Sequence, residues 1–98
     1  MNRINDYEII EEIISYGENV NLWLVEDSSG KELEVLTIKP KEEFGKQISR
    51  ILRNEINPLV GLELKGVQTI LETGFDKTNN LHFIVYKNSQ EGFHPINN

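Results

Sequence analysis

Lys39 is the residue of this chain whose type and position most clearly suggest chemistry. It ends an alternating, largely apolar stretch, Glu32–Lys39, in which Thr37 and Lys39 point to the same side of a strand, about 7 Å apart. An ammonium group on an apolar strand face is costly to bury alone, so we expect it to meet an anion. The alternative is a solvated residue at a strand boundary, because Pro40 and further charged residues follow.

Hydrophobic patterns upstream of Lys39 predict the elements that would position it. Val20–Glu26 is apolar on both faces near its middle and predicts a strand, which a turn over 27–30 joins to Glu32–Lys39. Ser15–Asn21 contains Gly17 and predicts a turn. Tyr7–Ile14 has isoleucines at helical spacing, yet it is rich in the β-branched residues that favour a strand, so both readings stay open there.

Downstream of Pro40, the pattern predicts one helix and two more strands. Apolar residues at steps of three and four predict a helix from Glu42 to about Leu62, with Pro58 kinking or ending it near Asn57. The further strands are Val67–Thr73 and Leu81–Tyr86. The order β-β-β-α-β-β predicts an α+β domain, with a five-stranded antiparallel sheet and one helix on one of its faces.

Length and composition limit the classes of protein. The chain has 98 residues, enough for one core, and it carries 10 basic and 16 acidic residues, a net charge of −6. This balance argues against nucleic acid and against an anionic membrane surface as partners. The chain has no cysteine, no membrane-length apolar run and no apolar signal segment, so we expect a cytoplasmic protein. We expect His82 and His94 to be ordinary histidines, and we expect no metal site.

The order of elements resembles the N-terminal lobe of the protein kinase fold. Leu36-Thr37-Ile38-Lys39 is similar to the family's Val-Ala-Ile-Lys motif, and Arg53-Asn54-Glu55-Ile56 resembles the part of its αC helix that carries a glutamate. The resemblance runs from about Tyr7 to Gly92. It implies a domain over residues 1–92, with residues 93–98 as a tail or the start of a linker to a second lobe.

The resemblance also implies a site for ATP. Lys39 would contact phosphate oxygens and Glu55 would hold Lys39 in place. Gly17 would lie in the loop that covers the phosphates. An apolar surface for adenine would come from Ile14, Leu22, Thr37 and Val85, and the hinge Tyr86-Lys87-Asn88 would offer backbone groups to adenine. Magnesium would be held only together with a second lobe.

Two departures from the kinase pattern affect the expected activity. The family's Gly-x-Gly-x-x-Gly loop corresponds here to Ser15–Val20, in which only Gly17 is kept, while Glu18 and Val20 disfavour a triphosphate. The catalytic His-Arg-Asp and metal-binding Asp-Phe-Gly motifs belong to the second lobe and do not occur in this sequence. We therefore expect this chain alone to be inactive, whether the parent protein is a Ser/Thr-type kinase or a pseudokinase.

Three functional hypotheses follow from these observations. In the first, the chain is the nucleotide-positioning half of a kinase-like protein, completed by a second lobe in cis or in trans. In the second, it is a pseudokinase-like interaction module that binds no nucleotide and uses its uncovered surface for a partner or for self-association. In the third, it is an unrelated small α+β binding domain.

Overall fold

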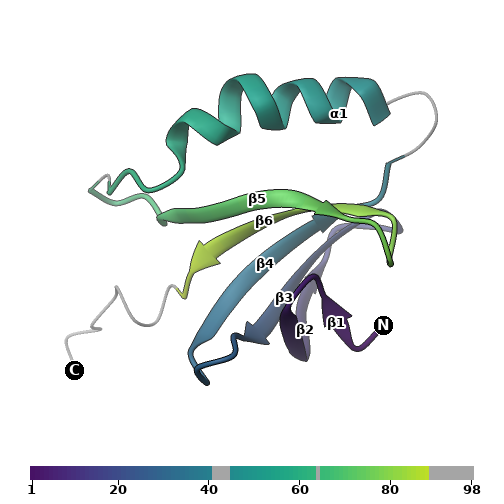
Figure 1. The fold of residues 1–98 in the computed structure, drawn as a ribbon, viewed down its shortest axis with the longest axis vertical. Helices are drawn as coiled ribbons and strands as arrows, with labels where there is room; N and C mark the ends of the chain where they lie inside the picture. Colours follow the sequence, from purple (N-terminus) through teal and green to yellow (C-terminus); the bar gives the residue numbers. More distant parts are fainter. Residues whose placement is uncertain (41–44, 64, 89–98) are drawn as a thin grey trace.

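The fold is an α+β domain in which a curled antiparallel sheet carries one helix. The computed structural model describes residues 1–40, 45–63 and 65–88 (Figure 1). The strands are β1 (Arg3–Ile4), β2 (Tyr7–Ser15), β3 (Val20–Glu26), β4 (Glu32–Ile38), β5 (Ile70–Asp76) and β6 (Leu81–Lys87). The predicted α+β class is confirmed, but the prediction of five strands is wrong, because the sheet has six. The predicted domain end at residue 92 and the tail over 93–98 lie outside the described residues.

β1 is the strand that the sequence pattern did not reveal. It has only two residues, which is too short for any alternation to be visible. Its Ile4 is nevertheless completely buried, and it pairs with Tyr7 of β2 across a tight turn in which Asn5 has a φ of 55°. β1 therefore adds a core residue as well as an extra strand.

The strands lie side by side in the order β1-β2-β3-β4-β6-β5. β2, β3 and β4 form the predicted meander, whereas the chain returns after the helix to the edge strand β5 and then to β6, between β4 and β5. The strand that leads into Lys39 is therefore central. Its register with β6 places Val35 directly opposite Val85.

β2 resolves the ambiguity between helix and strand in favour of a strand of nine residues. Its pairing with β3 shifts between Ile9 and Glu11 and again between Glu12 and Ile14. At each shift the bulged strand carries one residue more than its partner, which breaks strict alternation. These two bulges explain why the isoleucines of β2 follow a spacing that resembles a helix.

The helix changes its geometry before Pro58. α1 (Gly45–Ile51) is α-helical, η1 (Leu52–Ile56) is a π-helical turn and η2 (Asn57–Leu59) is a 3₁₀ turn. Proline cannot donate to the carbonyl four residues earlier, and its ring crowds that carbonyl, so the preceding turn widens and the Asn57 N–H bonds to the Leu52 carbonyl. The predicted change near Asn57 is confirmed. The helix ends at Leu59 rather than Leu62, and its predicted start falls outside the described residues.

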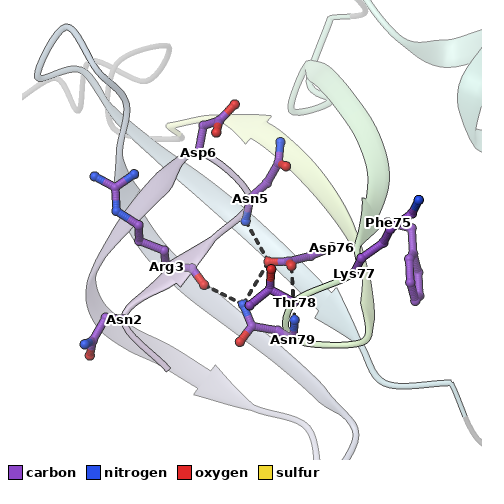
Figure 2. Close-up of a pocket in the computed structure, with 9 residues that line it drawn as sticks. All are labelled: Asn2, Arg3, Asn5, Asp6, Phe75, Asp76, Lys77, Thr78 and Asn79. Carbon is purple, nitrogen blue, oxygen red and sulfur yellow. Dashed lines mark hydrogen bonds between the residues drawn. The ribbon is translucent and has the colours of Figure 1, made fainter.

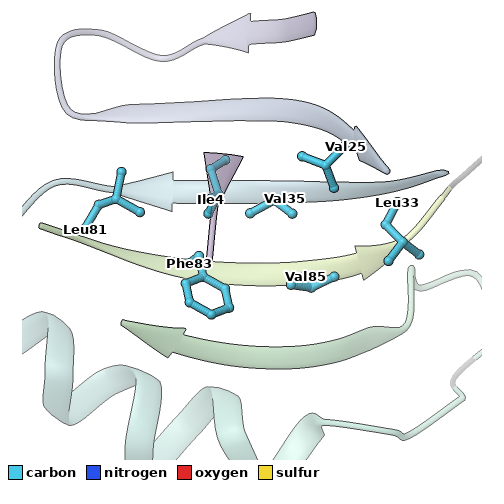
Figure 3. Packing of buried hydrophobic residues seen from close by; sticks show 7 residues of the cluster. All are labelled: Ile4, Val25, Leu33, Val35, Leu81, Phe83 and Val85. Carbon is cyan, nitrogen blue, oxygen red and sulfur yellow. The ribbon is translucent and has the colours of Figure 1, made fainter. Parts of the chain in front are cut away.

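Two hydrophobic clusters lie on opposite sides of the sheet. The larger one fills the concave side and consists of Ile4, Val25, Leu33, Val35, Leu81, Phe83 and Val85 (Figure 3). The smaller one lies under the helix and consists of Leu52, Ile70 and Ile84, with partly buried neighbours that include Leu36 and Ile48. Alternate residues of β4 and β6 thus serve two different cores, as the pleat of a strand requires.

Side chains join the two ends of the curled sheet. The Tyr7 hydroxyl of β2 donates to the Glu72 carboxylate of β5 at 2.8 Å. The Asn5 N–H donates to Asp76 at 2.7 Å, and the Asn79 side chain donates both to Asp76 and to the Arg3 carbonyl (Figure 2). The sheet is therefore closed on its concave side by hydrogen bonds rather than by a continuous strand ladder.

Gly74 gives a direct test of the packing on that side. A Cβ atom at Gly74 would lie 2.7 Å from Cζ of Phe83, whose side chain is only 3% exposed. Because the ring is held by the core, we expect Gly74→Ala to lower the free energy of unfolding by about 1–3 kcal/mol, measured by urea denaturation. In a Phe83→Leu background the same substitution should cost much less, and an equal cost in both backgrounds would contradict this account.

His82 makes the stability of the fold sensitive to mild acid. Burial lowers the pKa of His82 from its ordinary value of 6.5. The His82 ring packs edge to face against Phe75, with 4.9 Å between the ring centroids. The unfolded state binds the proton more readily, so this stabilisation is complete above pH 6.5 and is lost as the pH falls through the folded pKa. We expect denaturation midpoints to fall from pH 7.5 to pH 5.5 in the wild type and to fall less in His82→Gln; equal slopes would contradict the prediction.

Candidate functional site

The Lys39 side chain lies beside a groove between the sheet and the helix. Lys39 follows β4 directly, and its backbone N–H donates to the Asn19 carbonyl at 2.8 Å, which fixes the β2–β3 turn against the exit of β4. The groove has a volume of about 440 Å³. It is lined by Asn19, Val20, Ile38, Lys39, Gln47, Ile48 and Ile51. This surface is mainly apolar, and Lys39 is the cationic residue on its rim.

The structure does not bring Glu55 to Lys39. Both side chains are exposed, and within the described residues no hydrogen bond or ion pair joins the Lys39 ammonium to the Glu55 carboxylate. The helix residues that line the groove are Gln47, Ile48 and Ile51 of α1, while Glu55 lies in η1, one turn further along the helix. The pairing that the resemblance implies is therefore not formed in this arrangement.

The four residues expected around adenine divide between the two faces of the sheet. Thr37 and Val85 point to the concave side, where they are 2% and 0% exposed. Ile14 pairs with Leu22, and Leu22 pairs with Leu36, which packs under the helix, so these three share the opposite face. The residues expected to surround one ring thus contribute to two separate surfaces.

The concave side at Thr37 and Val85 is already occupied by the protein itself. The Trp23 indole N–H donates to Oγ1 of Thr37 at 2.9 Å, and Val85 belongs to the larger hydrophobic cluster. Even a partly buried indole N–H favours an acceptor, which Thr37 supplies. In the described conformation an adenine ring would have to displace core side chains to reach Val85.

The expected hinge is bonded within the domain. The Lys87 N–H donates to the Thr69 carbonyl at 2.9 Å, and the Lys87 carbonyl accepts the Gln68 side-chain amide at 2.7 Å. Tyr86 packs against the cluster under the helix, where burial raises its pKa, and Asn88 is buried. The backbone groups of Lys87 are therefore used by the segment that leads into β5.

Gly17 adopts the conformation that its position in the turn requires. Its φ is 115°, a region that other residues rarely adopt. The turn is fixed by a hydrogen bond from the Tyr16 N–H to the Val20 carbonyl at 2.8 Å and by the Ser15 hydroxyl, which donates to the Gly17 carbonyl at 3.0 Å. These contacts account for Gly17 by turn geometry alone, so its proposed place above phosphates stays a prediction.

The sequence pattern did not single out Asp76, a buried carboxylate that accepts several hydrogen bonds. Asp76 is 5% exposed and accepts from the Asn5 N–H and from both the backbone and the side chain of Asn79 (Figure 2). Burial raises the pKa of Asp76, but the hydrogen bonds from Asn5, Asn79 and the Thr78 N–H outweigh it, and the net effect lowers the pKa. Asp and Asn commonly bond to nearby backbone in turns, so the Asp-Lys-Thr-Asn sequence from Asp76 to Asn79 is the signal that could have indicated this cluster.

The cluster around Asp76 is structural rather than chemical. A hollow of about 590 Å³ lies beside it, lined by Asn2, Arg3, Asn5 and Asp6 and by residues 75–79. The hydrogen bonds of the Asp76 carboxylate come from donors of the protein itself. In the part of the chain that the structure describes, no three acidic or histidine side chains are placed to hold a metal ion.

Comparison with known proteins does not assign the chain to a family. No protein-family model matches it, and no curated protein is significantly similar to it. Over the described residues, no helix has the length and apolar character that crossing a membrane requires. The architecture, a curled antiparallel sheet with one helix, is loosely compatible with a kinase N-lobe.

Proposed function

We propose that this chain is an interaction module of N-lobe-like architecture that binds another protein and not a nucleotide. The single observation that carries the proposal is the state of the expected adenine surface, because Val85 is completely buried in the core and Thr37 is bonded to Trp23. Lys39 and Glu55 add to this support, because both are exposed and no hydrogen bond or ion pair joins them in the described structure.

The surface available to a partner lies on the helix side of the sheet. The helix covers β5 and β6 and part of β4, so apolar residues of β2, β3 and the end of β4 stay accessible. We call this surface the open face; it consists of Ile14, Val20, Leu22, Ile38, Ile48 and Ile51. Ile14 is 42% exposed and Ile51 is 49% exposed. Grouped apolar side chains of this kind commonly mark contact sites between proteins.

A nucleotide titration tests the first half of the proposal. The full chain, as wild type and as Lys39→Ala, is titrated with ATP with and without magnesium and followed by NMR. We expect no saturable shifts at Thr37, Val85 or the amides near Lys39. Saturable shifts at those positions that disappear in Lys39→Ala would overturn the proposal.

A pair of matched variants tests the second half. Ile51→Asp places a charge in the open face, whereas Val67→Asp places the same charge at an apolar residue that is 60% exposed outside it. We expect a purified partner to bind the wild type and the Val67 variant with similar affinity. Its affinity for the Ile51 variant should be at least tenfold lower. Equal affinities of the two variants would remove the open face from the proposal.

A second candidate function is the nucleotide-positioning half of a kinase-like protein. It is favoured by the placement of Lys39 beside the groove under α1, at the end of a central strand adjacent to β6. Under this candidate, a second lobe would have to rearrange α1 so that Glu55 reaches Lys39. The ATP titration separates the two candidates, because only the second one expects binding that depends on Lys39.

A further inference from the structure

β2 leaves most of one edge without a strand partner. β1 pairs only with the start of β2, at Tyr7 and Glu8, and one further bond runs from the Ile9 N–H to the Asn2 carbonyl at 3.0 Å. Over the described residues, no strand pairs with the outer edge of β2 from residue 10 to residue 15. An unpaired edge presents backbone donors and acceptors that an extended chain can bond.

The side chains along this edge are apolar and acidic. Ile10, Ile13 and Ile14 are 45%, 42% and 42% exposed, and Glu11 and Glu12 between them are exposed as well. Edge strands that avoid association usually carry charges and bulges, and this edge has both. The charges and bulges therefore disfavour nonspecific strand pairing at this edge. The exposed isoleucines remain available to a partner whose charges complement the glutamates.

Charge decides between a second copy of this chain and a different partner. Two copies that pair edge to edge would bring Glu11 and Glu12 of one close to those of the other, and each chain carries a net charge of −6. Like charges that face each other across paired strands are destabilising. A strand with lysine or arginine opposite these glutamates would instead gain attraction and faster association.

We infer that the outer edge of β2, residues 10–15, accepts an extended segment of a partner protein that carries both cationic and apolar residues on each of its faces, because Glu11 and Ile14 lie on one face of β2 and Glu12 lies on the other. This strand addition deepens the proposed interaction function and rests on it, since it names the chemistry of the partner. Ile14 lies on the same face as Leu22, so an apolar residue of the added strand opposite Ile14 would extend the open face. Main-chain hydrogen bonds supply affinity in this mode, and alternate side chains supply specificity.

The test uses the full chain and synthetic peptides as probes. An eight-residue lysine-valine peptide, in which two lysines alternate with two valines so that both faces carry lysine, is titrated into isotope-labelled protein. The controls are a glutamate-valine peptide of the same pattern and the lysine-valine peptide N-methylated at alternate backbone positions. We expect saturable shifts at the amides of residues 10–15 with the first peptide only, and slower amide exchange at the same positions. Equal binding of the N-methylated peptide would overturn the inference, because strand addition requires backbone bonds.

Charge variants of the protein provide the matched control. Glu11→Lys combined with Glu12→Lys should lower the affinity for the lysine-valine peptide about tenfold, because two exposed charge pairs are lost. Glu32→Lys combined with Glu63→Lys changes the net charge equally at exposed sites elsewhere and should have little effect. Equal weakening by both double variants would show general electrostatic attraction and overturn the inference.

The outcomes separate this inference from the proposed function. Shifts confined to Ile38, Ile48 and Ile51 would overturn the strand addition and leave the open face intact as a binding surface. Self-association in sedimentation, with concentration-dependent shifts at residues 10–15, would replace the cationic partner by a second copy. Absence of binding by every probe would also overturn the inference, whereas the proposed function is judged by the nucleotide titration and the Ile51 variant.

Discussion

Replacing Phe83 by alanine should lower the free energy of unfolding by about 3–5 kcal/mol. Phe83 is 3% exposed, lies in the larger cluster on the concave side and has its ring against the backbone of Gly74 (Figure 3). Removal of the Phe83 side chain leaves a cavity. The sheet cannot collapse into this cavity, because hydrogen-bonded strands fix the residues around it. The loss is a large share of the stability of a domain this size, so urea denaturation at low temperature is the suitable measurement.

Phe75 provides the matched control for Phe83. It lies on the neighbouring strand, is 42% exposed and contacts the His82 ring only edge to face. We expect Phe75→Ala to cost about 1 kcal/mol, as for a partly exposed aromatic contact. If Phe83→Ala were no more costly than Phe75→Ala, the concave cluster would not be the main core. Phe83→Leu keeps a smaller loss measurable should the alanine variant not fold.

Replacing Asp76 by asparagine should lower the free energy of unfolding by about 2–3 kcal/mol at neutral pH. The carboxylate accepts hydrogen bonds from the Asn5 N–H, from two donors of Asn79 and from the Thr78 N–H, and an amide nitrogen in its place would face a donor. Hydrogen bonds to a buried charged group are stronger than neutral ones, and the groups left behind lose their acceptor. The effect should appear in the urea midpoint and in faster amide exchange of β1.

The stability difference between the wild type and Asp76→Asn should depend on pH, because the same hydrogen bonds lower the pKa of Asp76. The folded pKa of Asp76 is lowered relative to the unfolded state, so its contribution is complete above about pH 4 and is lost as the pH falls through the folded pKa. The difference between wild type and Asp76→Asn should therefore shrink on acidification from pH 5 to pH 2. Asp6→Asn, an exposed carboxylate on the neighbouring turn, should change stability by less than about 0.5 kcal/mol. A constant difference across this pH range would contradict the account.

The hydrophobic pattern predicted strand bounds best for strands that are paired without interruption along their length. Val20–Glu26 was predicted with the bounds that the structure shows, and Glu32–Lys39 was one residue too long. The strand predicted over Val67–Thr73 runs instead from Ile70 to Asp76. Gly74 has no side chain to continue an alternating pattern, and the Phe83 ring occupies the space where its Cβ would lie.

Other features depend on contacts that no local pattern contains. The two bulges of β2 shift its isoleucines between faces, so their spacing alone could not distinguish strand from helix. β1 is defined by pairing rather than by its two residues. The same limit applies to the site: the spacing of Lys39 and Glu55 fits a shared function, whereas the helix places Glu55 one turn beyond the groove.

The face assignment of the candidate adenine residues shows the limit most clearly. Thr37 and Val85 share the concave side, as an alternating pattern in β4 and β6 allows. Leu22 and Ile14 fall on the other side, because cross-strand register, which the sequence does not display, decides which residues of neighbouring strands meet. A resemblance carried by short motifs can therefore place the elements correctly in order and still leave the surface between them undetermined.

The hydrogen bonds that close the curled sheet have a consequence for the route by which the chain folds. They link residues separated by 65, 71 and 76 positions, from Tyr7 to Glu72, Asn5 to Asp76 and Arg3 to Asn79. The entropy of closing such long loops must be paid before the contacts stabilise anything, and folding slows as contacts become less local. We therefore expect the β2–β4 meander to assemble early from neighbouring segments, and the N-terminal residues to dock last, once β5 and β6 are in place to receive them.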